Sequence, residues 1–383
     1  MARVLLAWEL GANLGHVAIM LALAKELRER GHQAVFALRD LSNALLLARE
    51  RFAFFAAPAR GGPGRRGAYP SYAAMLAGEV FPSAGATLAG ALAWRSIFRA
   101  VRPDLLIADH APGALLAARG LGFPVAAFGV PFSVPVVGRA LPTFGGGDSQ
   151  REDERLLGRL NGALAALRAP QLGAASDLYR VDATMVRGVP ETDCFAPRPD
   201  DDYVSTSTAD AGAAVPEWPS ATGARVLAYL RPGPWLEPAC EALASRSSSA
   251  IACVPGLDEK AASKLQRTGI HVARELCRFS TLIEQSDIVL CHGSHNTTVA
   301  AVLAGKPLVL LPTYVEQFLT SARIVAAGAG SVPQKLEADS LASCLDAVAP
   351  GSDACQQAQR IAAEHGAKAT RSRALDRAEA ALA

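Results

Sequence analysis

The 383-residue sequence lacks close cysteine pairs and a strong net charge. Its seven cysteines are scattered without any C-x-x-C spacing. This pattern argues against a disulfide framework and a structural zinc site, and it fits a reducing cytoplasm. Lys and Arg total 38 against 36 acidic residues, a net charge of +2. No strong electrostatic field therefore favours nucleic acid or an anionic membrane.

Long apolar runs are also missing. The apolar stretch 121–138 is interrupted by Pro124, Pro131 and Pro135, so it predicts a strand and a loop rather than a membrane span. Val4 to Trp8 is too short for a signal-peptide core and predicts a first strand. We expect a cytoplasmic protein. Residues 58–70 hold four Gly, three Pro and three Arg, which predicts a mobile surface loop and leaves peripheral membrane contact open.

The length and the alternation of elements predict an α/β protein with two domains. Short apolar runs followed by helical patterns are typical of parallel sheets covered by helices. A stretch rich in Pro, Asp, Ser, Thr and Gly, residues 190–218, marks the junction. We expect an N-terminal domain over 1–205, a linker over 206–222 and a C-terminal domain over 223–383. The final helix, 353–382, is expected to pack toward the N-terminal domain.

Residues 287–330 carry the clearest chemistry, because polar side chains follow the predicted strand 288–291 at the start of a helix. Backbone N–H groups and the helix dipole favour an anion there, and phosphate fits. The side-chain donors at this position are His292, Ser294, Asn296, Thr297 and Thr298, beside Gly293. After the next strand, 308–311, Glu316 and Gln317 offer a carboxylate and an amide suited to sugar hydroxyls. An ordinary N-cap and a solvated helix start are the alternative interpretation.

In the first half, His16 begins a helix after the strand 3–8 and a Gly-bearing turn. A helix N-terminus disfavours the imidazolium, so a histidine there stays neutral and can accept a proton. Asp109 follows the predicted strand 105–108. Taken alone, His16 has a structural alternative, and Asp109 could cap the following helix. In the second half, Arg231 follows the strand 225–230 and could pair with a phosphate.

The block from the His-Gly opening at 292 through Ala304-Gly305-Lys306-Pro307 and Glu316-Gln317-Phe318 to Gly328-Ala329-Gly330 resembles the donor-site signature of GT-B glycosyltransferases. The likeness is to inverting UDP- and dTDP-sugar enzymes of natural products, lipids and small molecules. It implies two Rossmann-like domains whose parallel sheets face a central cleft. It also implies that His16 is the general base, that Asp109 holds it, and that Arg278 and Phe279 contact the nucleobase. The acceptor would meet Asn13, Trp94 and Phe132.

The resemblance has departures. Many bacterial relatives have Gly where Ser294 and Asn296 stand, and Ala300 and Ala301 occupy the region of a ribose-binding acidic residue in plant-type members. We expect an inverting, metal-independent transferase with no cofactor besides the UDP- or dTDP-sugar, acting on a hydroxyl of a small, apolar acceptor. Asp200-Asp201-Asp202 is interpreted as a solvated charge run rather than a metal motif. A GT-B-type sugar-nucleotide epimerase and a non-catalytic nucleotide-sugar-binding subunit are the rival hypotheses.

Overall fold

The computed structural model describes residues 1–11, 14–58, 69–145, 148–204, 214–220, 222–246, 248–369 and 373–382. Asn13 and most of the predicted loop 58–70 lie outside these ranges, as does much of the predicted linker 206–222. The chain forms two compact units. The first unit comprises Met1–Arg187, Phe195–Val204 and Ser372–Ala383, and the second comprises Gly188–Cys194 and Ser205–Arg371. This division differs from the predicted boundaries in two segments: residues 188–194 belong to the second unit, and residues 372–383 belong to the first.

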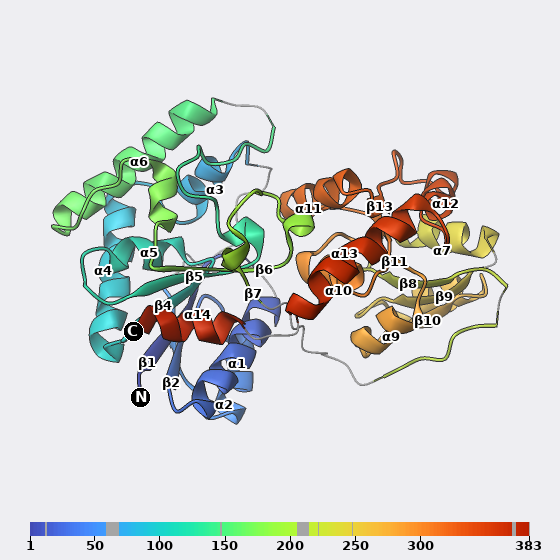
Figure 1. Cartoon of the computed structure of the whole chain (residues 1–383), viewed down its shortest axis with the longest axis horizontal. Coiled ribbons are helices and arrows are strands. Elements are labelled where there is room, and N and C mark those ends of the chain that lie inside the picture. The colour runs from blue at the N-terminus through green and yellow to red at the C-terminus, as the bar shows by residue number, and fades with distance from the viewer. Residues whose placement is uncertain are drawn as a thin grey trace. The chain divides into compact units, whose positions relative to one another are not determined.

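The first unit contains a seven-stranded parallel sheet in the order β3-β2-β1-β4-β5-β6-β7 (Figure 1). Its strands are β1 (Arg3–Trp8), β2 (Gln33–Leu38), β3 (Ala53–Ala56), β4 (Leu105–Asp109), β5 (Val125–Gly129), β6 (Ala183–Arg187) and β7 (Tyr203–Val204). Its helices are α1 (Leu14–Glu29), α2 (Ala44–Arg49), α3 (Tyr72–Glu79), α4 (Ala84–Val101), α5 (Pro112–Ala118), α6 (Ser149–Ala166) and α14 (Arg373–Leu382). The strand order reverses direction between β1 and β4, and ligands bind at such switch points in open α/β sheets.

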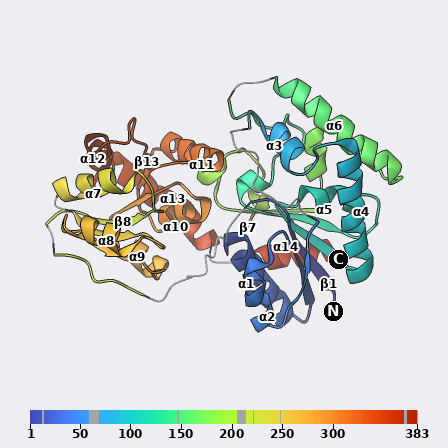
Figure 2. The same ribbon diagram turned by 180° about the vertical axis from the view of Figure 1, so that it is seen from behind.

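The second unit repeats this topology with six parallel strands in the order β10-β9-β8-β11-β12-β13. Its strands are β8 (Arg225–Tyr229), β9 (Ser249–Cys253), β10 (His271–Ala273), β11 (Ile288–Cys291), β12 (Leu308–Leu310) and β13 (Gly330–Ser331). Its helices are α7 (Leu236–Ser245), α8 (Glu259–Gln266), α9 (Phe279–Gln285), α10 (His295–Leu303), α11 (Val315–Ala326), α12 (Ala338–Ala347) and α13 (Asp353–Ala369). Helix α8, labelled in Figure 2, contacts β10. The switch point lies between β8 and β11.

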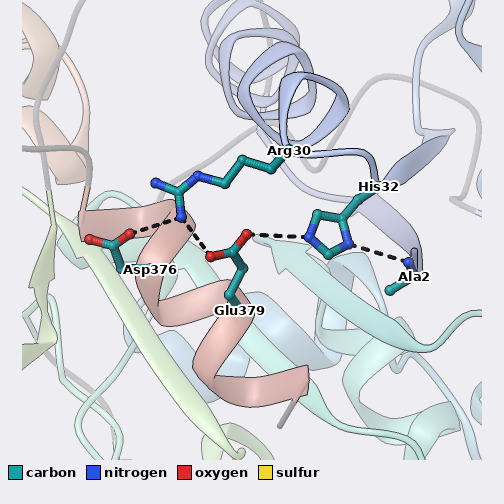
Figure 3. Close-up of polar contacts among 5 residues, drawn as sticks. All are labelled: Ala2, Arg30, His32, Asp376 and Glu379. Carbon is teal, nitrogen blue, oxygen red and sulfur yellow. Dashed lines mark hydrogen bonds and ion pairs between the residues drawn. The ribbon is translucent and has the colours of Figure 1, made fainter.

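The C-terminal helix α14 belongs to the first unit. Ala374, Leu375 and Ala378 are buried in the same cluster as β1, β2, β4 and the apolar face of α1. Polar contacts fix the outer face of α14 (Figure 3): the Arg30 guanidinium donates to Asp376 at 3.1 Å and to Glu379 at 2.5 Å. His32 accepts the Ala2 N–H at Nδ1, so Nε2 carries the proton that faces Glu379 Oε1 at 3.3 Å. The helix thus closes one apolar face of the first sheet.

One element prediction needs correction. The predicted helix 353–382 is two helices, α13 and α14, which belong to different units. A 3-10 turn, Leu41–Asn43, precedes α2, and the Asp40 carboxylate accepts the N–H of Ser42 at its start. The strands β1 and β11 have the predicted bounds, as expected for short apolar runs buried in a parallel sheet.

None of the described helices is both long and apolar enough to cross a membrane.

Candidate active site

A histidine-carboxylate pair lies at the switch point of the first sheet. Asp109 ends β4 and is paired in register with Trp8 at the end of β1. His16 is near the start of α1, and its Nδ1 lies 2.8 Å from Asp109 Oδ2. Asp109 is 2% exposed, so its charge acts in a site poor in water. Because an ionised carboxylate only accepts, Nδ1 carries the hydrogen and Nε2 carries the lone pair in the neutral ring.

The ring of His16 is held on two further sides. Trp8 stacks on it, with ring centroids 5.3 Å apart and planes 18° apart. Gly11 has φ +95°, and a Cβ at this position would lie 2.5 Å from His16 Nε2. A glycine is therefore required both by the left-handed backbone and by the close approach of the ring. Gly11 therefore lies directly beside His16 Nε2.

Two buried ionisable groups that the sequence analysis did not single out flank this pair. Glu9 is 4% exposed, and its carboxyl accepts the Gly113 N–H at 2.6 Å and the Trp94 indole N–H at 3.2 Å. Burial raises the pKa of Glu9 to about 7, although these hydrogen bonds oppose the shift. His110 is buried beside Tyr72, and burial first, then the charge of His16, lowers its pKa to about 3. His110 therefore stays neutral, and no second imidazolium competes with His16.

A cavity of about 300 Å³ opens beside the same strand end, with Glu9, Arg39, Phe81 and Thr87 among its lining residues. Most of its other lining is Ala, Gly, Val or Leu, and the volume is at the lower end for small-molecule sites. Trp94 and Phe132, which were predicted to meet the acceptor, do not line it. Trp94 is 0% exposed, so it is a core residue that supports Glu9.

Phe132 packs in a cluster of aromatic rings with Tyr72, Phe144 and Phe195, and only 6% of it is exposed. The resemblance to GT-B glycosyltransferases had placed it on the acceptor surface. Its ring instead turns inward, since these neighbours bury more of its apolar area than a loop position would.

In the second unit, the turns after β8 and β11 are tied together at the switch point. His292 Nε2 accepts the backbone N–H of Arg231 at 3.0 Å, and its Nδ1 lies 2.9 Å from the Leu311 carbonyl, to which it donates. Both ring nitrogens are thus occupied, and burial lowers the pKa of His292. The prediction that His292 donates to a phosphate is not met by this arrangement. The histidine instead holds three strand ends in register and leaves the exposed Arg231 side chain near them.

The start of α10 has the features of an anion site. Gly293 has φ +76°, and a Cβ there would lie 2.4 Å from Ser321 Oγ, so only glycine fits the turn. Ser294 occupies the N-cap position but makes no side-chain capping hydrogen bond, and its hydroxyl donates to Thr297 Oγ1 at 3.0 Å. Asn296 is half-buried on the first turn, and Thr298 is fully buried. The first-turn N–H groups are therefore not satisfied by the N-cap side chain.

Glu316 and Gln317 lie on the first turn of α11, after β12. Gln317 is 1% exposed, and its carbonyl Oε1 accepts both the N–H and the hydroxyl of Thr313 at 2.8 Å. The amide therefore shapes the loop before α11. Glu316 is half-buried beside it.

The predicted nucleobase turn lies at the start of α9. Arg278 is the N-cap residue and is exposed, and its N–H donates to the Ala214 carbonyl at 2.7 Å. The Phe279 ring is half-buried, with its centroid 5.0 Å from that of Tyr229 at the end of β8. An aromatic pair at the carboxyl edge of the sheet offers a surface on which a base could stack.

One group of side chains in the described part of the chain could hold a metal ion: Glu191, Glu364 and His365, whose ligand atoms lie within 4.8 Å of one another. His365 Nε2 is 3.2 Å from Glu191 Oε2. Arg323 and Arg360 line the same hollow of about 450 Å³, and their positive charges oppose a cation. We interpret this group as an ion pair. The Asp200–Asp202 run forms a separate 3-10 turn with no buried residue.

Comparisons with known proteins agree with this architecture. No protein-family model matches the chain. Over 89 residues, 22% of this chain, it is 34% identical to a sterol 3-beta-glucosyltransferase of Kluyveromyces lactis. Over 84 residues, 21% of this chain, it is 33% identical to a PGL/p-HBAD biosynthesis glycosyltransferase of Mycobacterium tuberculosis. These matches span only 7% and 20% of the two relatives.

Solved structures match over nearly the whole length. The calicheamicin glycosyltransferase CalG4 has a TM-score of 0.74 and 19% identity, with 100% of this chain and 98% of that one covered. The spinosyn rhamnosyltransferase SpnG, complexed with thymidine diphosphate, has a TM-score of 0.70 and 19% identity over 99% and 100% of the two chains. The chain has the GT-B fold. Each unit has one switch point, the position at which open α/β sheets generally bind ligands.

Proposed function

We propose that this GT-B chain is an inverting glycosyltransferase that moves a sugar from a UDP or dTDP donor to a hydroxyl of a small, apolar acceptor. The observation that carries the proposal is the 2.8 Å contact between His16 and the buried Asp109. A carboxylate in this position fixes the ring tautomer and stabilises the imidazolium that forms when Nε2 takes a proton. A subunit that only bound nucleotide-sugars would have no use for such a pair.

The chemistry assigned to the first unit is proton removal from the acceptor. The cavity is lined by Glu9 and Leu10 but not by His16, so an acceptor whose apolar part lies in it would have to extend its hydroxyl past Leu10 to the histidine. That hydroxyl would give its proton to His16 Nε2 as its oxygen attacks the anomeric carbon. The bond to the diphosphate breaks as the new bond forms on the opposite face of the sugar, which inverts the anomeric centre. The mostly apolar cavity lining supports a small, apolar acceptor.

The chemistry assigned to the second unit is stabilisation of the departing nucleoside diphosphate. The uncapped first turn of α10 supplies backbone donors, and Arg231 supplies a positive charge next to His292. Donors and charges that are already in place can stabilise developing negative charge without a metal ion. We therefore expect activity to survive EDTA. Loss of activity on chelation, with recovery on Mg²⁺ or Mn²⁺, would contradict the metal-independent mechanism and direct attention to Glu191, Glu364 and His365.

The base is tested with His16→Ala, for which we expect turnover to fall by roughly 100- to 10,000-fold while nucleotide binding stays nearly intact. His271→Ala, on β10 of the second unit, is the matched control. Asp109→Asn should also lower turnover while keeping the shape of the site, and its pH-rate profile should differ from that of the wild type. Full activity in His16→Ala would remove this residue from the mechanism, and a product with retained anomeric configuration by NMR would exclude inversion.

Glu316 and Gln317 are assigned to the donor sugar, since they follow the strand next to the α10 site. Each lost hydrogen bond costs about 0.5–1.5 kcal/mol, so Glu316→Ala or Gln317→Ala should weaken the intact nucleotide-sugar more than the free nucleoside diphosphate. Titration of both ligands by calorimetry measures this. Because Gln317 also holds Thr313, equal losses for both ligands would show that it supports the loop only.

A further inference from the structure

Two cysteines that are far apart in the sequence meet in the second unit. Cys253 ends β9 and Cys277 precedes α9, and their Sγ atoms are 3.1 Å apart. A disulfide has an S–S distance of about 2.05 Å, so the two sulfurs need to approach by about 1 Å to bond. Both are free thiols in the structure. We propose that Cys253 and Cys277 form a reversible disulfide, an oxidative modification site that adjoins the nucleobase turn.

The two thiols differ in a way that assigns their roles. Cys253 is 1% exposed and Cys277 is 7% exposed. Leu276 and Arg278, the neighbours of Cys277, are both exposed, so a small oxidant needs to pass little protein to reach its sulfur. The S–H of Cys253 donates to Cys277, which lowers the pKa of the Cys277 thiol and raises that of Cys253. Cys277 is thus the nucleophile and Cys253 the resolving thiol.

The oxidant is a hydroperoxide such as hydrogen peroxide. The Cys277 thiolate attacks one peroxide oxygen, the O–O bond breaks, and a sulfenic acid and hydroxide form. Cys253 then attacks the Cys277 sulfur, its proton joins the departing hydroxide as water, and the S–S bond forms. The two thiols lose two electrons and two protons, and the peroxide becomes two waters.

The position of the pair gives the modification a consequence. Cys253 is paired in register with Tyr229, whose ring contacts Phe279. Cys277 forms an isolated parallel β-bridge with Ala214, and the backbone N–H of Arg278 donates to the Ala214 carbonyl. Drawing Cys277 toward β9 therefore displaces Arg278 and Phe279 relative to Tyr229. This step rests on the proposed function, because it takes the turn to be the nucleobase site. We expect affinity for UDP or dTDP to fall about tenfold on oxidation, which is the equivalent of one good hydrogen bond.

The first experiment asks whether the bond forms. The reduced full-length protein is treated with hydrogen peroxide and digested without reductant, and cross-linked peptides are identified by mass spectrometry. The expected product joins the peptides of Cys253 and Cys277, lacks two hydrogens and disappears with dithiothreitol. Cys277→Ser should abolish it, whereas Cys344→Ser, equally exposed at 7%, should not. Absence of this cross-link, or a preference for another cysteine pair, would overturn the proposal.

The second experiment measures UDP and dTDP binding by calorimetry before oxidation, after oxidation and after reduction. Reversible weakening in the wild type, absent in Cys277→Ser, supports the coupling to the turn. Equal affinities in the oxidised and reduced protein would refute that coupling. Failure of the reduced protein to bind either nucleotide would instead refute the proposed function. The cross-linking experiment would still test the modification site independently of that result.

Discussion

The Glu9 carboxyl makes a prediction about stability that does not depend on the proposed activity. Burial raises its pKa from 4.5 to about 7 in the folded protein. Below pH 4.5 the group is protonated in both states, and above pH 7 it is ionised in both. Between these values the folded protein keeps a proton that the unfolded chain releases, so stability falls as pH rises. At 1.36 kcal/mol for each pKa unit, the loss between pH 4.5 and 7 is about 3 kcal/mol.

The perturbation is Glu9→Gln, which is neutral at every pH and should remove this dependence. The readout is the difference in unfolding free energy between wild type and variant. Other groups cancel in that difference, including His110, whose depressed pKa makes the native state lose stability as pH falls below about 6.5. Amide hydrogen exchange of β1 and β4 at several pH values reports on the first unit alone.

Between pH 4.5 and 7 the unfolding free energy of the wild type should fall by about 3 kcal/mol relative to that of Glu9→Gln. The absolute stability of the variant is less informative, because glutamine has one acceptor oxygen for the two donors, Gly113 and Trp94, that Glu9 satisfies. Glu29→Gln, at an exposed position of α1, is the control and should leave the pH dependence unchanged. Parallel pH dependences for wild type and Glu9→Gln would refute the reasoning.

Two further predictions concern the first unit. Gly11→Ala places a Cβ 2.5 Å from Nε2 of His16, so the ring must move by about 1 Å and turnover should fall about 100-fold. The control Gly31→Ala, with φ +84° and nothing within 4 Å, carries the same kind of backbone strain and should stay active. Similar activities in the two variants would contradict the close approach. Leu375→Ala should lower the unfolding free energy by about 2–5 kcal/mol in denaturant titration. Leu382→Ala, at the less buried end of α14, should lower it clearly less. Equal decreases in the two variants would show that α14 adds little to the core.

The sequence was sufficient for most of the fold, because strands buried on both faces leave unbroken apolar runs such as Ile288–Cys291. It was less sufficient where a helix ends without a Gly or Pro signal, as between α13 and α14. The pairing of His16 with Asp109 came from the resemblance to GT-B glycosyltransferases. The residues alone showed only that each follows a predicted strand. The role of His292 could not be anticipated, since it depends on hydrogen bonds to Arg231 and Leu311 from neighbouring strand ends.

The sequence pattern also did not predict which side chains are buried. Glu9 follows a strand at a turn, where carboxylates are usually solvated, yet it caps α5 inside the protein. Trp94 stands on an amphipathic helix, and its sequence position does not say whether its face meets a cavity or the core. The pair Cys253 and Cys277 was missed for a related reason, because strand order brings the two residues together across 24 positions of chain.

The return of α14 to the first unit constrains the order of folding during synthesis. The ribosome releases the chain from its N-terminus, and domains generally fold as they emerge. The second unit ends with residue 371, and Ala374, Leu375 and Ala378 follow it but belong to the core around β1 and α1. The first unit, although synthesised first, cannot cover that face of its sheet until the second unit has been made. Its nascent form therefore exposes an apolar surface for as long as the remaining half of the protein takes to translate.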